Sequence, residues 1–114
     1  EGISLNAKDA GLWFALGLLE VRLANTDAAL TALKKAAMLE TTPGYYHYVL
    51  AIALNDQGQP KEALETLSHV QREAPGQPNV LAALVQYSQS TGDVAAATRY
   101  RAELDATLRA AGWQ

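Results

Sequence analysis

The chain has 114 residues, a net charge of −3, no cysteine, and hydrophobic residues at 49% of its positions. This length suits one domain with a modest core, and no basic face is available to attract nucleic acid or a lipid surface. The missing cysteine excludes disulfides, thiolate metal sites and covalent haem attachment within this segment.

The first two elements are predicted to be helices over residues 9–23 and 26–40, with Asn25 at the capping position of the second. The earlier helix is hydrophobic nearly all round, and a helix of that kind must be covered on both sides. Three covers are open: residues 1–8, an upstream part of a larger protein, or another chain. The apolar run is too short to span a bilayer, so we expect no membrane insertion.

The middle of the chain predicts helices over 44–57 and 60–73. Between them, Gly58 can take the left-handed conformation that ends a helix, and Pro60 suits the first position of the next. Gln59 would then be the capping residue of that next helix, as a weak version of a capping box.

The residues of "YYHY", at positions 45–48, divide between two faces of this third helix, because positions three and four apart share a face. Tyr46 and His47 fall on the stripe that also holds the packing residues of the helix, and we interpret them as structural. Tyr45 and Tyr48 fall on the other stripe, where contact with a partner and packing against a neighbouring helix are both open.

The last two elements are predicted over 78–91 and 93–111, with Asp93 as a strong capping residue. The final helix is the most charged of the six, and Arg101 replaces an apolar residue there. The end of a repeat array needs a polar outer face, so this pattern is typical of a terminal helix. Trp113 either folds back over that end or belongs to a disordered tail.

A spacing of 34 residues relates the three pairs of helices. Apolar and small residues recur at this spacing, as in the sets Leu16, Leu50, Leu84 and Ala29, Ala63, Ala97. A fixed period of this length indicates an array of helix–turn–helix units, and therefore an all-α fold.

These residues resemble the pattern of the tetratricopeptide repeat family. Copy one carries Trp13, Leu16, Gly17, Ala29, Leu33 and Ala36. Copy two keeps Leu50, Ala51, Gly58, Ala63, Leu67 and Pro75, and copy three keeps Leu84, Gly92, Asp93 and Ala97. The resemblance implies an α-α superhelix of three repeats and six helices. The expected divisions are a lead-in at 1–9, repeats at about 10–43, 44–77 and 78–111, and a tail at 112–114.

The resemblance also implies which residues line the inner, concave surface of the superhelix. They come from the stripe of each first helix that holds Tyr45 and Tyr48 in copy two. The surface is mostly apolar and aromatic over the first two copies and polar over the third. Lys and Asn, with which some family members hold a carboxylate, are missing from the matching positions, so a peptide, an amphipathic helix or a neighbouring domain is the expected partner. The expected partner-binding residues are Phe14, Leu18, Val21, Arg22, Tyr45, Tyr48, Ile52, Asn55 and Gln86.

The function expected from this pattern is that of a protein-interaction module. The alternative is a structural domain of a larger bacterial protein that has no separate ligand, or that forms a homo-oligomer through its apolar first helix. No catalytic or metal-ligand motif occurs, so we expect neither enzyme activity nor a cofactor, and no nucleic-acid partner.

The chain begins at Glu1 rather than Met, and we expect it to be part of a larger protein. Some stretches, such as "GDVAAATRYRAEL", are similar to repeat modules of bacterial multihaem cytochrome-type proteins, which implies an exported parent. The sequence itself leaves the compartment open between the cytoplasm and the periplasm.

Overall fold

The computed structural model describes residues 9–112, and in these residues the chain forms six α-helices and no strand. The all-α prediction is confirmed, and each helix begins and ends within one residue of its predicted bounds. We refer to α1–α2, α3–α4 and α5–α6 as repeats one, two and three. The helices are α1 (Ala10–Arg22), α2 (Thr26–Leu39), α3 (Tyr45–Asp56), α4 (Pro60–Glu73), α5 (Pro78–Ser90) and α6 (Val94–Ala110).

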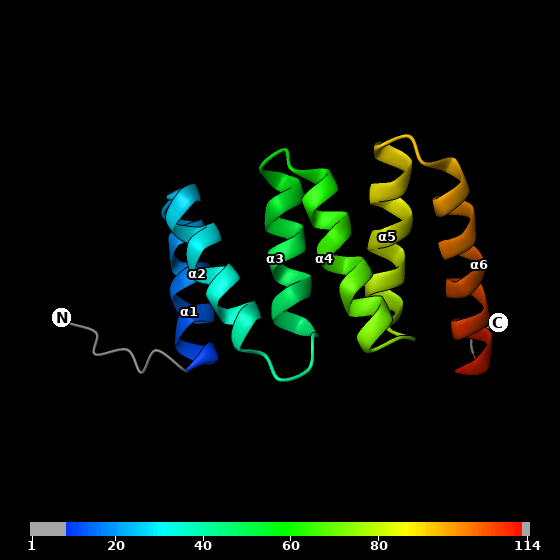
Figure 1. Ribbon diagram of the computed structural model, residues 1–114, viewed down its shortest axis with the longest axis horizontal. Coiled ribbons are helices and arrows are strands. Elements are labelled where there is room, and N and C mark those ends of the chain that lie inside the picture. The colour runs from blue at the N-terminus through cyan, green and yellow to red at the C-terminus, as the bar shows by residue number, and fades with distance from the viewer. Residues whose placement is uncertain (1–8, 113–114) are drawn as a thin grey trace.

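The six helices stand side by side in chain order, from α1 at one end of the molecule to α6 at the other (Figure 1). Each helix packs on the helices that precede and follow it in the chain. The result is elongated, with extents of 50 × 27 × 21 Å and a radius of gyration of 15.3 Å. A compact domain of this length would have a radius of gyration of about 13 Å. The array is therefore a solenoid of stacked hairpins.

Equivalent turns join the two helices of each repeat. Gly58 and Gly92 have φ angles of +79° and +86°, which confirms the left-handed conformation predicted at Gly58. In repeat one the same position is Ala24, with a φ of +61°. An L-residue with a side chain is strained in that region, so repeat one makes its turn at a cost that the other two repeats avoid.

The predicted capping positions of α2, α4 and α6 are confirmed, but only one of the three side chains makes a capping hydrogen bond. The Asp93 carboxylate accepts a hydrogen bond of 3.0 Å from the Ala96 amide, as expected of a capping residue. Gln59 and Asn25 occupy the capping positions of α4 and α2, but neither side chain makes a capping hydrogen bond. The Asn25 side-chain amide donates to the Glu20 carboxylate of the preceding helix at 2.7 Å.

Small residues sit where the paired helices cross. Ala29, Ala63 and Ala97 are at most 4% exposed, one in each second helix. Gly17 of α1 is buried against Leu33 of α2, and a Cβ atom placed on Gly17 would lie only 2.7 Å from the Leu33 Cδ2 atom. Close helix packing requires small side chains at the point of contact, so the spacing of small residues sets the geometry of each hairpin.

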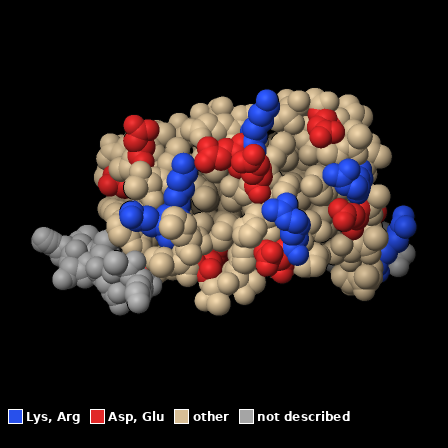
Figure 2. All heavy atoms as spheres, viewed as in Figure 1, with Lys and Arg blue, Asp and Glu red and all other residues tan. Residues whose placement is uncertain are grey.

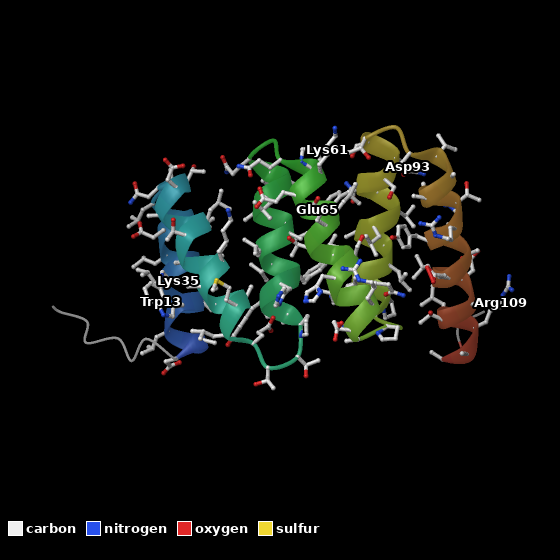
Figure 3. The ribbon with its side chains drawn as sticks, in the orientation of Figure 1. Trp13, Lys35, Lys61, Glu65, Asp93 and Arg109 are labelled. Atoms are coloured by element: carbon white, nitrogen blue, oxygen red, sulfur yellow. The ribbon has the colours of Figure 1, made fainter. Side chains whose placement is uncertain are left out.

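Charged side chains of both signs are interspersed over the visible face (Figure 2). Between repeats one and two, the Lys34 Nζ atom lies 3.4 Å from the Glu62 carboxylate. Within repeat one, the Lys35 ammonium lies 5.2 Å from the centre of a Trp13 ring (Figure 3). None of the helices in the described part of the chain has the length and apolar character needed to cross a membrane.

Candidate protein-binding face

The nine residues predicted to bind a partner lie on the first helices α1, α3 and α5, and we call this set the predicted binding face. Three of them are large, apolar and exposed to solvent: Leu18 at 42%, Val21 at 52% and Tyr45 at 61%. Arg22 and Gln86 are also exposed, whereas the other four are partly buried. The complete set is Phe14, Leu18, Val21, Arg22, Tyr45, Tyr48, Ile52, Asn55 and Gln86.

Aromatic rings join repeat one to repeat two. The Phe14 ring of α1 meets the Tyr45 ring of α3 edge to face, with centroids 5.6 Å apart, and stacks on the Tyr46 ring at 4.5 Å. Both distances are within the range at which aromatic pairs attract. The contact with Tyr45 joins two members of the predicted binding face, and the contact with Tyr46 supports its predicted structural role.

A second group links α3 to α5. Tyr48 and Ile52 are partly buried and pack against the hydrophobic core. Burial raises the pKa of the Tyr87 hydroxyl above its usual 10.0, and the negative charge of Asp56 and the nearby Tyr48 raise this pKa further. Tyr87 belongs to the hydrophobic core against which Tyr48 packs, so side chains of repeats two and three share this core.

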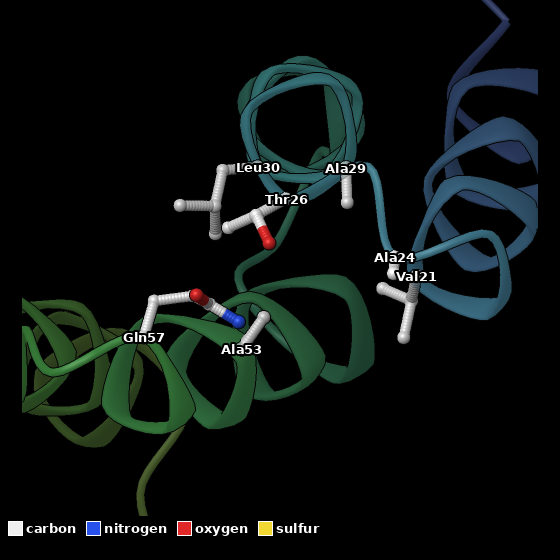
Figure 4. A pocket seen from close by; sticks show the side chains of 7 residues that line it. All are labelled: Val21, Ala24, Thr26, Ala29, Leu30, Ala53 and Gln57. Atoms are coloured by element: carbon white, nitrogen blue, oxygen red, sulfur yellow. The ribbon is translucent and has the colours of Figure 1, made fainter.

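Val21 contributes to a different feature. It lines a cavity of about 220 Å³ at the turn between α1 and α2, where this turn meets the end of α3 (Figure 4). None of the other eight residues of the predicted binding face lines this cavity. Its other lining residues are Ala24, Thr26, Ala29, Leu30, Ala53 and Gln57.

Sequence reasoning missed the role of Glu40. Its carboxylate accepts hydrogen bonds from the backbone amides of Gly44, Tyr46 and His47 at 3.0–3.2 Å, and it lies 2.5 Å from His47 Nδ1. The open amides at the start of α3 favour a negative charge. An acidic residue shortly before a predicted helix is the signal in the sequence that indicates such a cap.

The two histidines lie closer together than their sequence positions indicate. The rings of His47 and His69 are 5.7 Å apart, and both residues are partly buried. Within residues 9–112, no group of three or more histidine and acidic side chains is arranged to hold a metal ion. His47 is therefore best described by its contact with Glu40.

A stacked array of helical hairpins with an exposed apolar stripe on its first helices is the architecture of a protein-interaction scaffold. A family model described as tetratricopeptide repeat matches residues 20–87, which is more than half of the chain. The chain belongs to the tetratricopeptide repeat family, whose members are typically scaffolds rather than enzymes.

Solved structures of one protein, MamA, share this fold. The crystal structure of MamA aligns with 94% of this chain and 63% of its own, at 20% identity and a TM-score of 0.84. A structure described as the crystal structure of MamA protein aligns with 92% of this chain and 57% of its own, at 20% identity and a TM-score of 0.81. The structure MamA MSR-1 C2 aligns with 94% of this chain and 62% of its own, at 19% identity and a TM-score of 0.79. The chain thus spans less than two thirds of these MamA chains, and the likeness concerns the fold.

No curated protein sequence matches the chain. The further similarity to repeat modules of bacterial multihaem cytochrome-type proteins has no counterpart among the matches above. That similarity, and with it the bacterial origin, stays a prediction.

Proposed function

We propose that the predicted binding face holds a short peptide, an amphipathic helix or part of a neighbouring domain. The observation that carries the proposal is the exposure of Leu18, Val21 and Tyr45 on consecutive first helices. Large apolar side chains that gather on one surface favour association, since their burial in an interface removes apolar area from water. The absence of a lysine and asparagine pair among the nine residues favours an apolar ligand over a carboxylate.

The ligand chemistry follows from the composition of the face. Phe14 and Tyr45 offer a rigid aromatic pair on repeats one and two, and aromatic side chains supply much of the binding energy in protein interfaces. Repeat three adds the exposed amide of Gln86. A ligand helix would match this face if its contacting side were apolar where it meets repeats one and two and polar where it meets repeat three.

The test begins with helical peptides selected by display on the unmodified protein. The double substitution Leu18→Ser with Tyr45→Ser removes exposed apolar area without opening the core, and we expect affinity to fall tenfold or more. The matched control is Met38→Ser, which changes an 81% exposed apolar residue on the second helix α2. Titration calorimetry measures affinity and circular dichroism checks helix content. Equal affinity in the double variant and the control contradicts the proposal.

The alternative is a domain that associates with itself through α1 and has no separate ligand. The exposed leucines of that helix favour this alternative, and sedimentation over a range of concentrations distinguishes the two. A monomer at all concentrations, together with a peptide that binds the predicted face, supports the interaction module.

A further inference from the structure

The outward side of α1 is an apolar surface distinct from the predicted binding face. Leu12 is 43% exposed, Leu19 is 48% exposed and Leu23, directly after the helix, is 59% exposed. These residues are separated by seven and four positions, so they form one stripe along the helix. Ala15 is exposed beside them and Leu16 is half-buried. We call these five residues the leading face.

Four of the five positions of the leading face are buried in repeat three. The α5 residues that stand 68 positions, or two repeats, after Leu12, Ala15, Leu16 and Leu19 are all apolar or aromatic. Their exposures are 0% for Val80, 6% for Ala83, 0% for Leu84 and 4% for Tyr87. The leading face therefore has the composition of an interior surface, but it lies at the surface.

The fold shows what covers this register elsewhere. The second helix of the preceding repeat packs on it: α2 packs on α3, and α4 packs on α5. Leu30, Leu33 and Ala37 of α2 belong to the same hydrophobic core as Leu50 and Leu54 of α3. The cover is thus an amphipathic helix with leucine and alanine at positions i, i+3 and i+7.

A second copy stacked end to end does not supply such a helix. The last helix of the described residues is α6, where the positions equivalent to Leu30, Leu33 and Ala37 of α2 are Thr98, Arg101 and Asp105, all exposed. Placing Arg101 and Asp105 against leucines would remove two charges from water on a surface that offers them no polar partner. The C-terminal end of the array is polar, and the N-terminal end is apolar.

We propose that the leading face binds the second helix of a further repeat that precedes this region in the same polypeptide. That helix would present a stripe of leucine and alanine at the spacing found in α2. This surface adds to the proposed function and does not depend on it, because the leading face and the predicted binding face are different sides of α1.

The test supplies the missing helix. A copy of residues 25–39, which contain α2 and its capping residue, is joined directly before Asn6 and replaces residues 1–5. This joint preserves the 34-residue spacing, so the added helix stands relative to α1 as α2 stands relative to α3. The matched control carries Leu30→Glu and Ala37→Glu in the added copy alone.

We expect the added helix to raise the melting temperature by about 4–8 °C relative to the control, which corresponds to about 1 kcal/mol for a domain near this size. Binding of a hydrophobic dye should fall, and hydrogen exchange in α1 should slow at least tenfold. Equal melting temperatures for the added helix and its control would overturn the proposal.

Two further outcomes would assign the surface to another occupant. A dimer of the unmodified protein in sedimentation, converted to a monomer of unchanged helix content by Leu19→Glu, would show that a second copy covers the leading face. Increased dye binding after deletion of residues 1–8, which lie outside the described residues, would identify that segment as the cover. The Leu18→Ser, Tyr45→Ser variant separates the two proposals. It should lose peptide binding, but the added helix should still raise its melting temperature.

Discussion

The first helices of repeats one and three carry the same pattern of apolar residues in opposite surroundings. In α5 the pattern is buried by α4, and in α1 the equivalent leucines face solvent. The stripes of α1 and α5 are similar in hydrophobic character, so the presence of a neighbouring helix decides whether the stripe is buried. The comparison teaches that in a stacked array the contribution of a residue to stability depends on its repeat as much as on its type.

The largest test of this comparison removes one leucine at each end. Leu84→Ala in α5 should lower the free energy of unfolding by about 2–5 kcal/mol, because the side chain is 0% exposed and its loss leaves a cavity. Leu12→Ala in α1, where 43% of the residue is exposed, should cost less than about 1 kcal/mol. Urea unfolding followed by circular dichroism measures both. Similar losses in the two variants would mean that α1 is covered in solution.

The linkers between repeats provide the second test. Glu40 caps α3 with its carboxylate, while the equivalent residue before α5 is Ala74, whose carbonyl accepts from the Gln77 side chain. Glu40→Ala should cost about 1–2 kcal/mol, since three amides at the start of α3 lose their acceptor. The control Glu73→Ala removes an exposed carboxylate from the end of α4. A thermal melt shows the difference, and equal melting temperatures would contradict a capping role for Glu40.

The fold could be predicted from the sequence because its signals repeat. The recurrence of Leu16, Leu50 and Leu84 fixes the register three times, and Gly58 and Pro60 mark a helix end and the next start. Local patterns of this kind do not depend on distant contacts.

Contacts between elements were harder to predict. The Glu40 carboxylate reaches backbone amides up to seven residues away, and the stacking of Phe14 on Tyr46 joins two helices. Such contacts depend on how the linkers direct each helix. For the binding face, the sequence places its residues on the first helices, while their shared role remains our proposal.

The turns between paired helices provide a third test, in which one substitution is expected to stabilise the protein. Ala24→Gly should stabilise the protein by about 0.5–1 kcal/mol, because glycine accepts the left-handed conformation that strains alanine. Gly58→Ala, the reverse change in repeat two, should destabilise by about 1 kcal/mol. Chemical unfolding of the two single variants is the measurement. A loss of stability for Ala24→Gly would show that the turn of repeat one is not strained.

The last test compares the two ends of the array through the pH dependence of stability at alkaline pH. The position of Leu19 in repeat one is occupied in repeat three by Tyr87, whose folded pKa is raised above 10.0 by burial and by the nearby Asp56 and Tyr48. Above pH 10 the unfolded chain loses this proton more readily than the folded chain does. The free energy of unfolding should therefore decline as pH rises, by up to about 1.4 kcal/mol per pH unit for one proton.

Tyr87→Phe should remove this part of the decline, and Tyr45→Phe, which changes a 61% exposed tyrosine, should leave it in place. Urea unfolding of the three proteins at intervals between pH 8 and pH 11 compares the slopes. The remaining tyrosines are common to all three proteins, so the difference between the two substitutions reports on the buried hydroxyl of Tyr87. If the free energy of unfolding declined as steeply with pH in Tyr87→Phe as in Tyr45→Phe, the Tyr87 hydroxyl would be exposed to water, and this position would not be buried in repeat three.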